Sequence, residues 1–237
     1  MSWINTFIEY AHEQLTGRER EALWSRGVSD DQIRLYQIGY VSNGLPCGLE
    51  GADVLREKYQ NTGWLRDVFV LPLTNTLGQN KGFQLRHVEE EKKGYSHFSV
   101  YEEEPVLFGL GQAMRAAWET RCLWLTEGVF DLFPIQRVCP NVIPTLTNHL
   151  SAETARCLRR VVDELWLAYD MDLAGRKAAA RVIRDYSGQF SRIHDVVFPR
   201  VPKFRGGKVK DPNELWLAWG DNKVQNFIRN QLGECYA

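Results

Sequence analysis

The chain has 237 residues, of which 44% are hydrophobic and 25% charged, values that suit one large or two small globular domains. No apolar run reaches the roughly 20 residues that span a bilayer, and no secretory signal is visible at the amino terminus. The formal net charge is −1, so a surface that binds nucleic acid must be local or supplied by a partner. Five scattered cysteines include no C-x-x-C pair, which predicts neither a zinc site nor disulfides and favours the cytoplasm.

The first hundred residues predict helices followed by antiparallel strands. Helical spacing favours helices over residues 3–15 and 18–26, and Ser29 opens a third helix with a capping box completed by Gln32. A short helix follows at residues 52–60. From Arg66 the pattern changes, and the expected strands cover residues 68–73, 83–88 and 95–100.

The remaining residues alternate strand and helix patterns. The expected strands are 122–126, 142–146, 164–169 and 194–199, and the expected helices are 109–120, 129–137, 151–161, 173–187 and 212–231. Such alternation is typical of a parallel sheet covered on both faces. The predicted fold class is therefore an α+β amino-terminal domain followed by an α/β domain with a parallel sheet flanked by helices, with the boundary near residues 101–108.

Two of the expected strands end in carboxylates. The run from Leu123 stops at Glu127, and the run from Leu165 stops at Asp170 and Asp172. Side chains just past the carboxyl ends of neighbouring parallel strands converge on one crevice, where such acids repel one another unless a cation lies between them. Each acid alone could instead cap a helix. Their combination favours Mg²⁺ or Mn²⁺ and metal-dependent phosphoryl chemistry.

The motif TEGVFD at residues 126–131, followed by YDMDLAG at residues 169–175, resembles the TOPRIM fold of primases, topoisomerases and some nucleases. Further segments, in family order, narrow the resemblance to the catalytic core of DnaG-type bacterial and phage primases. They are residues 26–40 (RG…IGY), 66–73 (RDVFVLPL), 82–86 (GFQLR), 107–110 (LFGL) and 210–214 (KDPNE).

The resemblance implies a primase-like α+β domain at residues 1–105, a TOPRIM domain at 106–215 and a helical tail at 216–237. The acids that it places at the site are Glu127, Asp131, Asp170, Asp172 and Asp211, which would bind two divalent ions. Glu127, Asp170 and Asp172 would be catalytic, with Glu127 as general base or metal ligand. Asp131 could equally be an acid favoured by the helix dipole in a first turn.

The cations that would handle nucleotide or template are Arg66, Arg86, Lys93, Lys203, Arg205, Lys208 and Lys210. The last four lie in a basic stretch around Gly206-Gly207, which suits triphosphate or template phosphates but equally a solvated loop.

The activity implied is that of a DNA-directed RNA polymerase that synthesises short RNA primers on single-stranded DNA from NTPs. Two metal ions would clamp the attacking hydroxyl and the leaving pyrophosphate. The zinc ribbon and helicase-binding domain of such primases find no counterpart here. Partners are therefore expected, either a replicative helicase or a separate zinc-bearing subunit, and the origin could be a phage or plasmid.

Three positions depart from the primase pattern: Val68 replaces an arginine, Glu103 stands where a lysine is usual, and Asn213 replaces an aspartate. These departures keep open a catalytically weak or inactive primase-like accessory subunit of a replication complex. A TOPRIM nuclease is the third alternative, although the primase-like segments ahead of residue 105 argue against it.

Overall fold

The chain divides into two compact units, Met1–Phe108 and Gly109–Ala237. The computed structural model describes residues 2–59, 64–89, 94–99, 104–147, 149–199, 201 and 208–233. Among these residues, no helix combines the length and the apolar character needed to cross a membrane.

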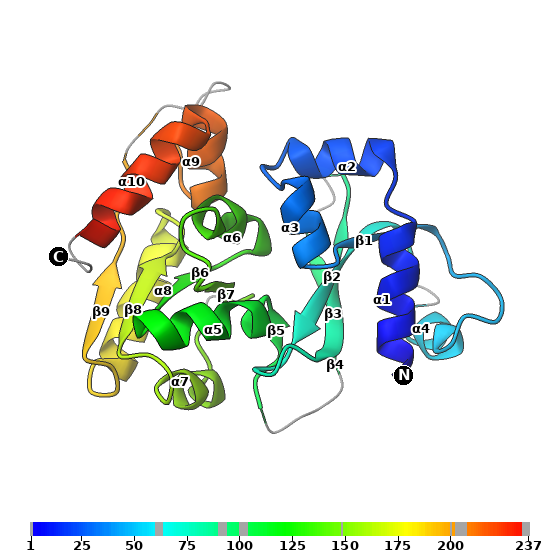
Figure 1. Ribbon diagram of the computed structural model, residues 1–237, viewed down its shortest axis with the longest axis horizontal. Coiled ribbons are helices and arrows are strands. Elements are labelled where there is room, and N and C mark those ends of the chain that lie inside the picture. Colours follow the sequence, from blue (N-terminus) through cyan, green and yellow to red (C-terminus); the bar gives the residue numbers. More distant parts are fainter. Residues whose placement is uncertain are drawn as a thin grey trace. The chain divides into compact units, whose positions relative to one another are not determined.

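The first unit contains an antiparallel sheet and four helices (Figure 1). The strand order is β1-β2-β3-β4, and β5 pairs with β2. The strands are β1 Gly39–Asn43, β2 Arg66–Thr74, β3 Asn80–His87, β4 Tyr95–Ser99 and β5 Leu107–Phe108. The helices are α1 Trp3–Glu13, α2 Gly17–Trp24, α3 Asp30–Leu35 and α4 Ala52–Tyr59.

Helices α1 and α4 supply one side of this unit's core. Phe7 and Leu55 from these helices are fully buried against Val68 and Val70 of β2 and Phe83 of β3. The apolar residues of α1 recur at helical spacing, so one face of the helix covers the sheet. Val68, which replaces an arginine of the primase pattern, therefore serves packing in this chain.

The second unit is a parallel sheet of order β7-β6-β8-β9 flanked by helices (Figure 1). Its strands are β6 Cys122–Thr126, β7 Val142–Pro144, β8 Glu164–Ala168 and β9 Arg192–Asp195. Its helices are α5 Leu110–Thr120, α6 Val129–Gln136, α7 Ala152–Leu158, α8 Leu173–Tyr186, α9 Pro212–Trp219 and α10 Asp221–Gly233. The described residues thus confirm the predicted fold class. The three-part division at residues 105/106 and 215/216 stays a prediction.

Most elements differ by a few residues from their predicted bounds, and the short strand β5 was not predicted, but three other differences matter most. β1 was not expected, and it forms because Gly39 to Asn43 pair with β2. The last expected helix, 212–231, is two helices, because Gly220 takes a φ of 75° that ends α9. β9 begins at Arg192 and not at residue 194, since its polar residues pair with β8. The apolar residues that follow β9 alternate between buried Val196 and exposed Val197 without continuing the strand.

Candidate active site

The acidic residues after β6 and β8 lie side by side because the two strands are neighbours in register. Thr126 lies opposite Ala168 in the last pair of the ladder, so the chain leaves both strands at the same edge of the sheet. Glu127 then accepts a hydrogen bond from the backbone N–H of Asp170 through Oε1, at 3.1 Å. This bond joins the two predicted motifs directly.

Three further helix starts bring acids toward this edge. Asp172 caps α8 by accepting from the N–H of Gly175 at 2.9 Å, and Asp211 caps α9 by accepting from the N–H of Glu214 at 2.7 Å. Asp131, in the first turn of α6, accepts from the N–H of Gly128 at 3.1 Å. Each of these aspartates therefore caps the start of a helix. Helices α6 and α9, which carry two of them at their starts, pack against each other. Local capping sets the rotamers of these carboxylates.

Lys210 supplies the ion pairs that the structure shows with these acids. Its Nζ lies 3.1 Å from Oδ2 of Asp170 and 3.8 Å from Oδ2 of Asp211. Its backbone N–H donates to Glu214 at 2.9 Å, and its carbonyl accepts from the N–H of Met171. Lys210 was assigned to phosphates from the sequence, and here its ammonium offsets part of the acidic charge.

Burial and mutual repulsion raise the pKa of most of these carboxyls. Burial is the main cause of the raised pKa of Glu127, and the charge of Asp170 adds to it. Burial and the charges of Asp211 and Asp170 raise the pKa of Asp131 well above its usual range. Burial also raises the pKa of Asp170 and takes that of Asp211 to about 6. The site thus favours the protonated form of these carboxyls more strongly than water does.

The donor set fits hard divalent cations, which prefer carboxylate oxygens. Within the described residues, however, no three acid, histidine or cysteine side chains are already arranged as ligands of one ion. The ammonium of Lys210 lies within ion-pair distance of both Asp170 and Asp211, and a cation held by these acids would compete with it. A divalent ion held by these carboxylates would therefore require their side chains to rearrange.

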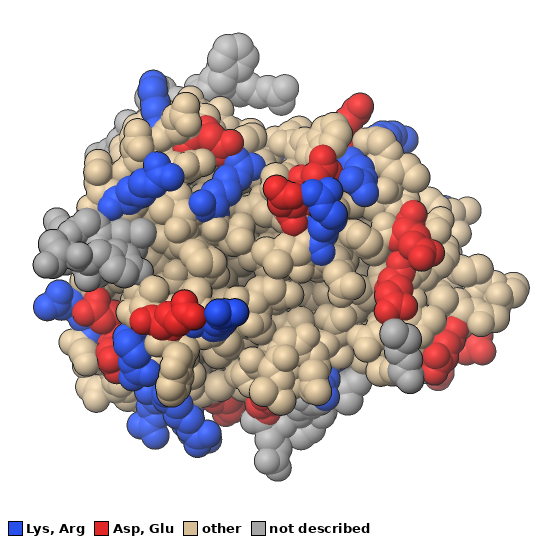
Figure 2. All heavy atoms as spheres, in the orientation of Figure 1, with Lys and Arg blue, Asp and Glu red and all other residues tan. Residues whose placement is uncertain are grey.

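The remaining predicted cations are dispersed. Arg66 begins β2, and its Nε donates to the Asn43 side chain at 3.1 Å. Arg86 lies in β3 opposite Phe69, and Lys208 is exposed. Lys93, Lys203 and Arg205, together with Glu103, lie outside the described residues. On the face drawn in Figure 2, basic and acidic side chains are interspersed, in keeping with the near-zero net charge.

Two residues of the site had no predicted role. A Cβ on Gly175 would lie 2.2 Å from the carbonyl oxygen of Asp170 and 2.5 Å from Oε1 of Glu127, so only glycine lets α8 approach the acids. Arg176, the next residue, contacts the chain at the Asp-x-Asp motif. For Gly175, the available signal was a glycine three residues after the Asp-x-Asp motif, in the first turn of a predicted helix.

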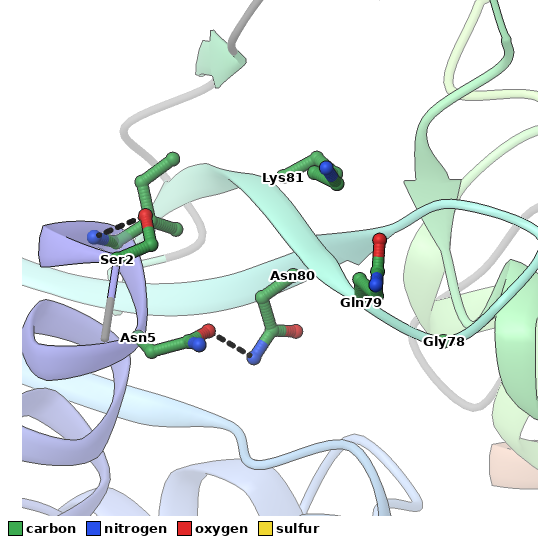
Figure 3. A pocket seen from close by; sticks show the side chains of 7 residues that line it. Ser2, Asn5, Gly78, Gln79, Asn80 and Lys81 are labelled. Atoms are coloured by element: carbon green, nitrogen blue, oxygen red, sulfur yellow. Dashed lines mark hydrogen bonds between the residues drawn. The ribbon is translucent and has the colours of Figure 1, made fainter.

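A hollow of about 460 Å³ lies elsewhere, in the first unit (Figure 3). It lies between the start of α1 and the β2–β3 turn, and its lining includes Ser2, Asn5, Asn80 and Lys81. Asn80 donates to the Asn5 side chain across it at 3.2 Å. None of the candidate acids lines this hollow, so it is separate from the carboxylate site.

Comparison with known proteins first defines a class. Residues 124–216, which include the acids of the site, match the Toprim-like family. Solved structures then extend the likeness to the whole chain. The zinc-binding and RNA polymerase domains of Aquifex aeolicus primase give a TM-score of 0.75 at 24% identity, covering 96% of this chain and 60% of that one. A Pseudomonas aeruginosa primase domain gives 0.73 at 21% identity, covering 98% and 77%.

Sequence relatives agree with the structures. The DNA primase of Aquifex aeolicus is 28% identical over 247 residues, which is 96% of this chain and 48% of that protein. That of Deinococcus radiodurans is 25% identical over 254 residues, covering 98% and 43%. The chain thus spans about half the length of these relatives. The predicted likeness to DnaG-type primase catalytic cores is confirmed, and the chain has their fold.

Proposed function

We propose that this chain is the catalytic core of a DNA primase, which synthesises short RNA primers on single-stranded DNA by divalent-metal-dependent nucleotidyl transfer. The observation that carries the proposal is the junction of Glu127 with the Asp170 loop at one sheet edge, in a chain with the fold of primase cores. A DnaG catalytic domain of similar fold, with a TM-score of 0.70, has been solved bound to single-stranded DNA.

The acids are proposed to divide the work at the site. Asp131, Asp170, Asp172 and Asp211 would hold Mg²⁺ or Mn²⁺, most simply as two ions. When bound, such ions stabilise the charge that develops on phosphoryl oxygens. Glu127 would act as general base or as a further ligand, and burial raises the pKa of its carboxyl, which makes it a better proton acceptor.

Single-stranded DNA and NTPs are the proposed substrates, handled by Arg66, Arg86, Lys93 and the basic residues from Lys203 to Lys210. The near-zero net charge supports only modest intrinsic affinity for a polyanion. A replicative helicase or a separate zinc-bearing subunit would then help to hold the template, in the cytoplasm and in the service of DNA replication.

The test is primer synthesis from labelled NTPs on single-stranded DNA with Mg²⁺ or Mn²⁺. The wild type should give short products that chelator abolishes, and Asp170→Asn should lower the rate by at least about 100-fold. Asp185→Asn, at the far end of α8 and paired with Arg184, is the matched control and should retain the wild-type rate. Cleavage of the template without synthesis would indicate a nuclease instead.

A primase-like accessory subunit without synthesis is the second candidate. It is favoured by the place of the Lys210 ammonium between two of the acids and by Asn213, where the primase pattern has an aspartate. This candidate predicts binding of single-stranded DNA with no incorporation, even when a helicase and a zinc-bearing subunit are added.

A further inference from the structure

We propose that Arg176 is a positioning residue that holds the Asp170–Asp172 loop in the orientation needed to bind metal. The inference rests on the proposed function, because the loop carries two of the proposed ligands. Arg176 itself touches no carboxylate of the site in the structure. It acts on the backbone that carries them.

A single guanidinium spans the end of β8 and the end of β9. Its Nη2 donates to the carbonyl oxygen of Tyr169 at 2.9 Å, and its Nε donates to that of Asp170 at 3.1 Å. Its Nη1 pairs with Oδ1 of Asp195 at 2.6 Å. Only a planar group with several fixed donors makes all three contacts at once, so lysine cannot replace it.

The two carbonyls lie beyond the sheet. The ladder of β8 with β6 ends at Thr126 and Ala168, and its ladder with β9 ends at Leu167 and Asp195. In the described part of the chain, no strand pairing therefore takes the carbonyls of Tyr169 and Asp170. Arg176 takes both, since buried carbonyls need partners. The N–H groups on the same stretch go to Glu127 and to the carbonyl of Lys210. The direction of the Asp170 side chain therefore depends on this set of bonds.

Charge and positioning make opposite predictions for metal binding. If Arg176 acted only through its positive charge near the acids, its removal would strengthen the binding of a cation. If it positions the loop, its removal weakens the binding, as loss of groups that orient metal ligands does in other sites. Arg176→Lys separates the charge effect from the positioning effect further, because lysine keeps the positive charge but lacks the planar set of N–H donors.

The experiment measures Mn²⁺ binding to the full chain, with Mn²⁺ alone as the probe, by electron paramagnetic resonance and calorimetry. Arg176→Gln and Arg176→Lys should bind at least about tenfold more weakly than the wild type. Arg184→Gln is the matched control, because Arg184 lies on the same helix, is 72% exposed and pairs only with its neighbour Asp185 among the contacts shown. It should bind within twofold of the wild type.

Amide exchange over residues 168–175 adds a readout that needs no metal. Arg176→Gln should speed exchange there while near-ultraviolet circular dichroism stays native. Wild-type Mn²⁺ affinity and unchanged exchange in both Arg176 variants would overturn the inference. If the wild type binds no Mn²⁺, the proposed metal site fails, and exchange alone decides the positioning role. Should Arg176→Gln fail to fold, Arg176→Lys alone decides, and wild-type exchange and affinity in that variant would overturn the inference.

Discussion

Helix α8 passes close to the carboxylates at Gly175, where the missing side chain leaves room for the Asp170 backbone and the Glu127 carboxylate. We expect Gly175→Ala to destabilise the protein by about 1–3 kcal/mol, because the new Cβ meets backbone and the Glu127 carboxylate. Chemical denaturation measures this free energy. Gly188→Ala is the control: it meets nothing within 4 Å and should change stability by less than about 0.5 kcal/mol.

Asp211 should make the stability of the metal-free protein depend on pH. Its folded-state pKa is raised to about 6 by burial, above the value of about 4 in the unfolded chain. The folded protein then binds more protons, so the contribution of Asp211 is fully present below pH 4 and is lost as pH rises through about 6.

Asp211→Asn keeps a helix-capping oxygen but removes this titration. Urea denaturation with chelator present should therefore show the variant gaining about 1–3 kcal/mol on the wild type between pH 4 and pH 7. Parallel pH profiles for the two proteins would contradict the raised pKa.

The sequence allowed prediction of the acids but not of the groups that orient them. Glu127, Asp170 and Asp172 follow apolar strands, and the parallel order of those strands implies that the acids meet. Arg176 could not be predicted this way, since its partners are two backbone carbonyls and Asp195, which only the folded chain brings together. The position of Lys210 between two acids could not be predicted either, because a lysine in a basic stretch is more simply interpreted as a phosphate ligand.

At the scale of elements, an aromatic row crosses the parallel sheet. Trp124 of β6 stacks on Trp166 of β8 with ring centroids 5.2 Å apart, and Trp166 stacks on His194 of β9 at 3.8 Å. The three residues are cross-strand partners in register, so the row ties neighbouring strands together on one face.

Trp166→Ala should therefore destabilise the second unit by about 3–5 kcal/mol, since the indole is 3% exposed and its loss leaves a cavity. Denaturation followed by far-ultraviolet circular dichroism measures the loss. Trp118→Ala is the comparison: this side chain is 63% exposed and should cost no more than about 1 kcal/mol, including its cation–π contact with Arg121. Equal costs would contradict the structural role of the row.

Element boundaries were harder to predict than element types. Periodicity identified the helices and buried strands, but β1 and β9 are short and partly polar, and they are strands because a neighbour pairs with them. The break between α9 and α10 depends on the positive φ of Gly220. A single glycine in an apolar run is not enough to predict such a break from the sequence.

At the scale of the whole molecule, the two units should serve different steps of the proposed reaction. Arg66→Gln, in the first unit, is expected to weaken binding of single-stranded DNA and to reduce its salt dependence, because the phosphate contact proposed for Arg66 would be lost. Its Mn²⁺ affinity should stay unchanged. Asp170→Asn, in the second unit, should weaken Mn²⁺ binding and leave the binding of single-stranded DNA unchanged. Fluorescence anisotropy with a labelled oligonucleotide and Mn²⁺ titration measure both, and loss of both properties in both variants would contradict the division.

The most direct test of the account is template-directed incorporation on homopolymers. With labelled ATP, Mn²⁺ and excess protein, we expect short RNA products on oligo(dT) and none on oligo(dC). Asp172→Asn should make none on either template, and chelator should abolish the products. The contradicting result is that the protein binds oligo(dT) but does not copy it, even with a proven zinc-bearing subunit and helicase present. The chain would then be a primase-like accessory subunit and not a primase core.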